Sequence, residues 1–229
     1  MTPNLSASLY LISGVLFILA LRGLSSPETS RQGNFFGISG MVLAIIVTFL
    51  FVDILSSSFI FIICALAIGG SIGTIIALRI SMTAMPQLVA GFHSLVGLAA
   101  VLVALSAFYS PETFELGTFN NIKKVSLIEM SIGASIGAIT FTGSIIAFLK
   151  LQGLMSGAPI IFKGQHFINL LIGIVIVSLI IYITINQSNH IFLFLIISSL
   201  LVGVLLIIPI GGADMPVVIS MLNSYSGWA

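Results

Sequence analysis

Residues 59–78 read FIFIICALAIGGSIGTIIAL, a run of twenty residues without one charged side chain. About 20 apolar residues in a helix cross the hydrocarbon core of a bilayer, which is about 30 Å thick. Inside lipid the backbone hydrogen bonds must be satisfied internally, and only helices and closed barrels achieve this. So long and continuous an apolar run therefore predicts a transmembrane helix.

The whole chain has a similar composition. Of its 229 residues, 59% are hydrophobic and 6% are charged, whereas a soluble domain carries about 25% charged residues. The mean hydropathy is +1.28. A surface so poor in charge suits lipid, and it lacks the basic face that electrostatic binding of nucleic acids requires. The first eight residues hold no Lys or Arg, so the first apolar run is expected to be a permanent helix and not a signal peptide.

We predict an all-α fold, a polytopic transmembrane helix bundle of about eight segments, with residues 1–229 forming one membrane domain. Polar connections are expected at residues 23–34 and, as the longest, at 110–124. The segments are expected at about Leu5–Leu21, Phe35–Val52, Phe59–Leu78, Pro86–Tyr109, Val125–Leu149, Phe167–Ile185 and Ile191–Ile210, and from about Ala213 toward Ala229.

The basic residues predict the orientation of the bundle. Cytoplasmic loops of membrane proteins are enriched in Lys and Arg. Alternate connections hold five of the seven basic residues, and the other side has only Lys123 and Lys124, beside Glu112 and Glu115. We therefore expect the N-terminus to face outward. The five residues on the expected cytoplasmic side are Arg22, Arg31, Arg79, Lys150 and Lys163.

Several classes of site lack their sequence signals. Residues 69–73 and 133–137 are glycine-rich, but both lie inside apolar segments, so they predict close helix packing and not a nucleotide fold. Cys64 has no cysteine to pair with, and it is interpreted as a small apolar side chain. The three histidines are far apart, so no metal site is expected. No convincing internal repeat is predicted.

Among the polar residues of the fourth segment, His93 costs the most free energy to place in the membrane, since it lies roughly 6 Å from the midplane of that segment. Its helical face carries almost only small residues: Pro86, Ala90, Gly97, Ala100 and Ala104. His93 is therefore expected to point into a packed interface or a narrow polar cavity. An imidazole exchanges protons near neutral pH, which predicts a proton relay. The alternative is a histidine that only hydrogen-bonds a neighbouring helix.

Glu129 and Ser144 share one face of the fifth segment with Gly133, Gly137, Thr140 and Ala147. Glu129 is expected near the outer end, and the deeper hydroxyls are suited to carry a chain of water. Two alternatives stay open. In the first, Glu129 is an interfacial carboxylate paired with Lys123 or Lys124. In the second, the hydroxyls donate hydrogen bonds back to carbonyls of their own helix.

The last segment offers Asp214 at its mouth and Asn223 nine residues further on, roughly 13 Å deeper along a helix. Asn223 shares a face with Pro216, Ser220 and Gly227, and its amide is suited to hold a water or the imidazole of His93. Asp214 lies two residues before Pro216, so capping of the helix start is the alternative to a functional role.

Four strings of the chain resemble the membrane part of the beta subunit of proton-translocating NAD(P) transhydrogenases. The strings are GADMPVVISMLNSYSGWA at 212–229, MPQLVAGFHSLVG at 85–97, LSSPETSRQGN at 24–34 and TFTGS at 140–144.

The resemblance implies a function and a set of site residues. Members of that family couple hydride transfer between NAD(H) and NADP(H) to proton movement across a membrane. The resemblance assigns the proton path to positions matched by His93, Asn223, Asp214, Ser144 and Glu129. It implies that this chain binds no cofactor itself, because NAD(H) and NADP(H) bind to partner or further domains. It also implies an alpha-subunit partner, alpha–beta pairs, contact with membrane lipid and a bacterial inner membrane.

One departure from the family pattern bears on activity. A beta subunit of this family continues through a further helix into an NADP(H)-binding domain, whereas this chain stops at Ala229. That domain is expected to be absent from the chain, through a fragment, a split gene or a truncation, and no hydride chemistry is expected on the chain alone. The rival functions are a small secondary transporter and a truncated remnant without activity.

Overall fold

The computed structural model describes residues 3–51, 56–119 and 121–227. The chain forms two compact units, Met1–Leu78 and Arg79–Ala229, and each is described by itself. Almost all regular structure is helical, so the predicted all-α fold is confirmed.

The first unit contains an antiparallel pair, α1 (Pro3–Leu24) and α2 (Ser30–Phe51), followed by α3 (Ser56–Arg79). The turn between α1 and α2 is shorter than the predicted polar connection because both helices extend into it. Gly23 and Gly33 make this possible, since a Cβ on Gly23 would lie 2.5 Å from the Cα of Gly33. Thr29 Oγ1 donates a hydrogen bond to the Gly23 carbonyl at 2.7 Å. The predicted end of the second segment at Val52 lies outside the described residues.

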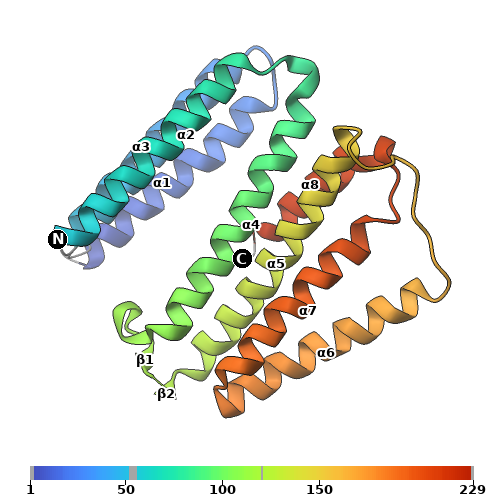
Figure 1. Cartoon of the computed structure of the whole chain (residues 1–229). Helices are drawn as coiled ribbons and strands as arrows, with labels where there is room; N and C mark the ends of the chain where they lie inside the picture. The colour runs from blue at the N-terminus through green and yellow to red at the C-terminus, as the bar shows by residue number, and fades with distance from the viewer. Residues whose placement is uncertain (1–2, 52–55, 120, 228–229) are drawn as a thin grey trace. The chain divides into compact units, whose positions relative to one another are not determined.

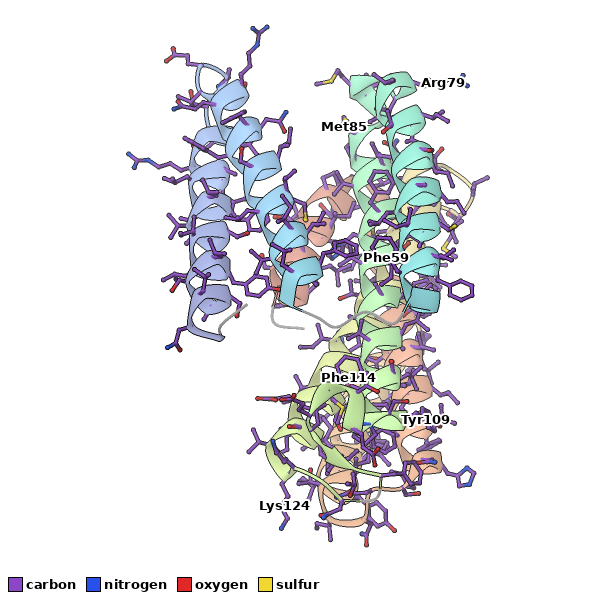
Figure 2. All side chains as sticks on the ribbon, turned by 90° about the vertical axis from the view of Figure 1, so that its left-hand side faces the viewer. Phe59, Arg79, Met85, Tyr109, Phe114 and Lys124 are labelled. Atoms are coloured by element: carbon purple, nitrogen blue, oxygen red, sulfur yellow. The ribbon has the colours of Figure 1, made fainter. Side chains whose placement is uncertain are left out.

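Helix α3 presents apolar side chains in every direction. Figure 2 shows them along the helix between Phe59 and Arg79, and no described residue of α3 is buried. Gly69, Gly70 and Gly73 have no atoms near the place of a Cβ. The predicted close packing of residues 69–73 is therefore not found within the described part of the chain. A helix that is apolar all round is suited to lipid or to neighbouring membrane helices.

The second unit is a layer of helices. Helices α4 (Met85–Tyr109), α5 (Lys124–Leu151), α7 (Asn189–Ile207) and α6 (Gln165–Asn186) lie side by side in that order (Figure 1). The short helix α8 (Met215–Ser226) packs against α4 and α5. Helix α5 touches all four of the other helices and is the most buried of the spans. Its position explains why it carries so many small residues.

Small residues set the distance between neighbouring helices. A Cβ on Gly97 of α4 would lie 2.6 Å from the Phe141 nitrogen of α5, and one on Gly137 would lie 2.8 Å from the Gly97 carbonyl oxygen. The predicted packing role of residues 133–137 is confirmed at Gly137. On the other side of α5, Thr142 Oγ1 donates a 2.8 Å hydrogen bond to the Leu200 carbonyl of α7. Such contacts let helix backbones approach closely in lipid.

The long connection before α5 has structure of its own. It contains a 3₁₀ turn (Pro111–Phe114) and two antiparallel two-residue strands, β1 (Gly117–Thr118) and β2 (Asn121–Ile122). Gln187, in the turn between α6 and α7, bonds both backbone groups of Ile122: its Oε1 accepts from the nitrogen at 3.0 Å and its Nε2 donates to the carbonyl at 3.2 Å. This amide ties the two connections together.

Among the described residues, seven helices are long and apolar enough to cross a membrane. The eighth predicted segment differs, because α8 has 12 residues, about 18 Å of helix rise. Residues 228–229 of that predicted segment lie outside the described residues. The predicted bundle of about eight helical segments is confirmed: the described residues form eight α-helices, seven of them long and apolar enough to span a membrane.

Candidate functional site

His93 is buried where α4 packs against α5. Its exposed fraction is 6%, and its Nε2 has no hydrogen-bond partner among the described residues. The predicted small-residue stripe surrounds it, since Ala90 and Gly97 on the same face are buried as well. A buried polar atom without a partner is costly, so it requires an explanation. The burial of His93 agrees with the prediction that it points away from lipid, but no described residue of a neighbouring helix bonds its Nε2.

Ser144 of α5 lies opposite His93. The two antiparallel helices touch at Gly97 with Phe141 and at Gly91 with Phe148, and these contacts bracket both residues. Ser144 is fully buried, and its Oγ likewise has no partner among the described residues. It does not bond back to its own helix, unlike Ser135, whose Oγ donates to the Ser131 carbonyl at 2.8 Å. The layer therefore holds two buried unsatisfied polar atoms at one level.

A groove of about 410 Å³ lies between the first turns of α4 and α8. It runs up to Asn223, and we call it the Met85 groove. Asn223 is exposed there and forms no hydrogen bond to His93, so the proposed direct contact is not found. The predicted shared face of α8 is confirmed for three residues. The lining is Met85, Pro86, Val89, Pro216, Ile219, Ser220 and Asn223.

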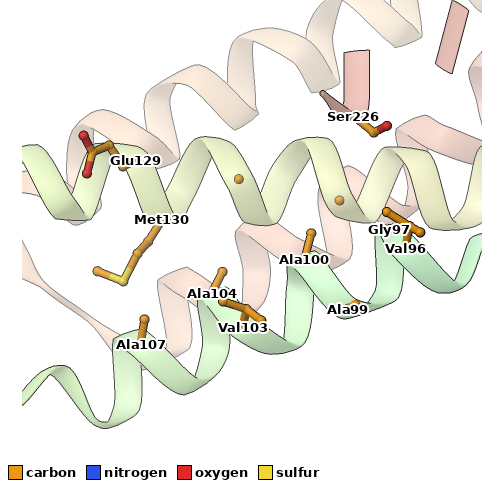
Figure 3. Close-up of a pocket in the computed structure, with 12 residues that line it drawn as sticks. Val96, Gly97, Ala99, Ala100, Val103, Ala104, Ala107, Glu129, Met130 and Ser226 are labelled. Carbon is orange, nitrogen blue, oxygen red and sulfur yellow. The ribbon is translucent and has the colours of Figure 1, made fainter. Parts of the chain in front are cut away.

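A second groove, of about 470 Å³, lies along α4 and α5 and is named the Glu129 groove. Figure 3 shows Glu129 at one end, Gly97 and Ser226 at the other, and alanine side chains along the α4 wall. Gly133 and Gly137 line it too, which confirms their predicted shared face with Glu129. Ser226 was not predicted as a site residue, although it follows Asn223 by three residues and so lies on nearly the same helix face.

The two grooves lie on either side of His93 along α4, and His93 lines neither of them. The Met85 groove reaches Val89 on α4, and the Glu129 groove begins at Val96 and Gly97. Seven residues separate Val89 from Val96, about 10 Å of helix rise, and His93 lies between them. The same holds on α8, where Asn223 lines one groove and Ser226 the other. The two helices therefore run in the same direction, and Asn223, like Val89, lies at the inner end of the Met85 groove.

One of the two alternatives for the carboxylates, capping of the helix start by Asp214, is not found among the described residues. Asp214 occupies the N-cap position of α8, but its side chain forms no capping hydrogen bond and is exposed. Lys123 Nζ donates to the Glu115 carbonyl at 3.1 Å and not to Glu129. Among the described residues no hydrogen bond joins either acid to His93; Glu129 lines the far end of its groove, and Asp214 directly precedes α8.

The start of α8 repeats the start of α4, which corrects the prediction that the chain has no internal repeat. Residues 84–97 read AMPQLVAGFHSLVG, and residues 214–227 read DMPVVISMLNSYSG. His93 and Asn223 occupy equivalent positions. The identical pairs are Met85 with Met215, Pro86 with Pro216, Ser94 with Ser224 and Gly97 with Gly227.

The backbone repeats as well. Each copy begins with a three-residue 3₁₀ helix, Met82–Ala84 or Gly212–Asp214, directly before the α-helix. The residues before the two α-helices have nearly the same dihedrals: φ −96° and ψ 7° at Ala84, φ −90° and ψ −5° at Asp214. The nitrogen of each donates to the carbonyl three residues earlier, at 3.0 and 3.1 Å. The sequence signal was only four identities in fourteen positions, which is weak without the geometry.

The site offers no metal centre among the described residues, where no cluster of three His, Cys, Asp or Glu side chains occurs. His166 and His190 are exposed in the first turns of α6 and α7.

Comparisons with known proteins point to one family. The family model described as NAD(P) transhydrogenase beta subunit matches residues 6–229. Two curated relatives, one from Rhodospirillum rubrum and one from a named strain of that species, bear the name NAD(P) transhydrogenase subunit beta. Each is 54% identical over all 229 residues, which make up 49% of its own length. The chain thus spans about half the length of these relatives.

Proposed function

The chain belongs to the NAD(P) transhydrogenase beta subunit family, and from this premise we propose that it is the membrane, proton-translocating part of such an enzyme. The assembled enzyme transfers hydride between NAD(H) and NADP(H) and couples this to proton movement. The observation that carries the proposal is the position of His93, buried with an unpartnered Nε2 along α4 between two grooves. Family membership argues against a secondary transporter.

His93 is the proton carrier of the proposed path. A carrier must exchange protons with one side at a time, and a residue between two separate grooves meets this need. Imidazole is the side-chain group that most often serves proteins as a proton shuttle. Ser144, on the facing helix, and Asn223, in the Met85 groove, orient the imidazole or the water that reaches it. The unsatisfied atoms of His93 and Ser144 are consistent with this role, because a buried polar group without a protein partner requires an explanation such as a bound water or a catalytic role.

Asp214 and Glu129 are the proposed outer stations of the path. Glu129 lines the far end of its groove, and Asp214 lies directly before α8, whose first turns line the Met85 groove. Access of His93 switches with the nucleotide state of a domain outside the membrane. A ligand drives such a switch only if it binds the two access states with different affinity.

The nucleotides are proposed to bind outside this chain. The glycine-rich stretches 69–73 and 133–137 lie within helices α3 and α5, and neither follows a strand as a dinucleotide fingerprint must. We propose that NADP(H) binds a further domain and NAD(H) an alpha subunit, in alpha–beta pairs. The proposed location is the bacterial inner membrane with the N-terminus outside, as the basic residues indicate.

The first test is His93→Gln, which keeps a polar side chain of similar reach but cannot titrate. It is made in the beta subunit assembled with its nucleotide-binding partners, in sealed vesicles. We expect proton uptake driven by hydride transfer to disappear. The matched control is His190→Gln, an exposed histidine at the start of α7, and it should pump normally. Unaltered proton pumping by the His93→Gln variant would refute the proposed path.

The second test addresses orientation and the two grooves. Cysteines are placed at Ser220, in the Met85 groove, or at Ala107, in the Glu129 groove, after replacement of Cys64 by serine. A membrane-impermeant maleimide should label Ser220→Cys only from the cytoplasmic side and Ala107→Cys only from the outer side. The reverse pattern shows that the predicted orientation is wrong, and labelling of both from one side shows that the grooves are not separate paths.

A further inference from the structure

Lys150, in the last turn of α5, is an almost fully buried cation. Its exposed fraction is 4%. The ammonium donates hydrogen bonds to three carbonyl oxygens, those of Ile208 and Ile210 at 2.6 Å and that of Ala158 at 3.4 Å. All three acceptors are backbone groups, so dipoles and not a carboxylate meet the charge. Burying an ammonium group costs several kcal/mol of solvation free energy, so Lys150 differs from an ordinary surface lysine.

The three carbonyls come from two segments that are distant in sequence. Ile208 and Ile210 follow directly on α7, whose terminal carbonyls lack intrahelical donors and carry the negative end of the helix dipole. Ala158 belongs to the connection between α5 and α6. One side chain therefore joins the end of α5, the end of α7 and this connection.

Backbone contacts reinforce the same junction. The Gly212 nitrogen donates to the Gly157 carbonyl at 2.8 Å, and the Ile160 nitrogen donates to the Ile208 carbonyl at 3.2 Å. The approach is close, because a Cβ on Gly212 would lie 3.3 Å from the Cα of Gly157. We call Lys150, residues 157–160 and residues 208–212 the Lys150 clamp.

The clamp lies directly before the second copy of the repeated motif. Gly212 is the first residue of the 3₁₀ turn that leads into α8, and Met215 after it is fully buried. Asn223 follows eight residues later, about 12 Å along the helix. The first copy, on α4, is held in depth by the contact of Gly97 with α5. The equivalent Gly227 on α8 has no atom closer than 3.4 Å to a Cβ, so α8 lacks this lock.

We propose that Lys150 is a positioning residue: through the clamp it sets the depth of α8, and thereby the level of Asn223 relative to His93. The proposal rests on the proposed function, since it assumes that both residues serve the proton path. Lys150 touches neither of them and acts only through the backbone that it holds. Its loss lets α8 shift along its axis, which misaligns the path without removing any group that carries protons.

The test compares Lys150→Met with Lys150→Arg and Lys163→Met in the assembled enzyme. Lys163 is an exposed lysine of the same connection and is the matched control. Two readouts are taken: protons moved per hydride transferred, and the rate of disulfide formation between Val89→Cys and Ser220→Cys, which line the same groove, in a Cys64→Ser background. Lys150→Met should lower the proton yield about tenfold or more and slow cross-linking severalfold. Lys150→Arg should restore much of both.

The outcomes that would contradict the positioning role of Lys150 can be told apart from those that would contradict the proposed function. If Lys150→Met matches Lys163→Met in both readouts, or lowers only the amount of enzyme while cross-linking stays normal, the positioning role is wrong. If Lys150→Met does not assemble, Gly212→Ala disturbs the same clamp with the lysine kept, and normal cross-linking there also overturns the proposal. Normal pumping by His93→Gln instead refutes the proposed function, and the cross-linking rates then still decide whether Lys150 sets the depth of α8.

Discussion

Replacing Gly97 by alanine should separate α4 from α5 at the level of the proton path. The new Cβ would lie 2.6 Å from the Phe141 nitrogen and 2.7 Å from the Gly137 carbonyl oxygen. Optimal contact distances between non-bonded heavy atoms are about 3.5–4.0 Å, so the helices must move apart locally by about 1 Å. Both obstacles are backbone atoms of a helix, which cannot rotate away as a side chain can.

The expected cost follows from overpacking, which destabilises well-packed cores by about 1–3 kcal/mol. For a domain of this size each kcal/mol lowers the melting temperature by about 2–4 °C. The matched control is Gly91→Ala on the same helix, where the nearest atoms are those of the Phe148 ring at 3.8 Å. Both variants gain the same helix propensity from alanine, so this gain cancels in the comparison.

The assay is thermal unfolding of the detergent-solubilised protein, followed by circular dichroism, together with proton pumping by the assembled enzyme. Gly97→Ala should melt about 2–12 °C below Gly91→Ala and should pump less, since Gly97 is one helical turn from His93. Equal melting temperatures would refute the reasoning that this glycine sets the distance between the two helices.

Two further substitutions test contacts between neighbouring elements. Thr142→Val removes the hydroxyl that donates to the Leu200 carbonyl, and it should lower the free energy of unfolding in urea by about 1 kcal/mol. The control Ser178→Ala removes a hydroxyl that bonds only within α6 and should cost less. Equal losses would show that the Thr142 hydrogen bond does not stabilise the contact between α5 and α7. Gln187→Leu removes both hydrogen bonds to Ile122, which should cost about 1–2 kcal/mol. The connection before α5 should then open more often and be cleaved faster by added protease. An unchanged cleavage rate would show that the Gln187 amide does not hold this connection in place.

The site illustrates what a pattern along one helix can and cannot predict. His93 was identified from its depth and its stripe of small residues, and burial against α5 agrees with that reasoning. Its relation to Ser144 depends on the register of two antiparallel helices, which follows from the contacts of Gly97 and Gly91. The repeat also could not be recognised from the sequence alone, because four identities in fourteen positions are weak evidence until the backbone dihedrals are seen to agree.

Lys150 shows the same limit for a charged residue. In the sequence it marks only the end of an apolar segment and the expected cytoplasmic side. Its role as a clamp depends on three carbonyls from residues 158, 208 and 210, and no local pattern links them to position 150.

The amino-acid sequence by itself determined that this chain is a bundle of membrane helices, where most of them begin and end, and which residues are costly inside lipid. These properties add up residue by residue, because transfer into hydrocarbon and helical hydrogen bonding act locally along the chain. Only the tertiary structure decided that His93 lies along α4 between two grooves, that Asn223 lines one of them and that Lys150 donates to carbonyls that precede α8. Those features depend on which helix surfaces fit together, and the fit is a property of pairs of surfaces that no single segment contains.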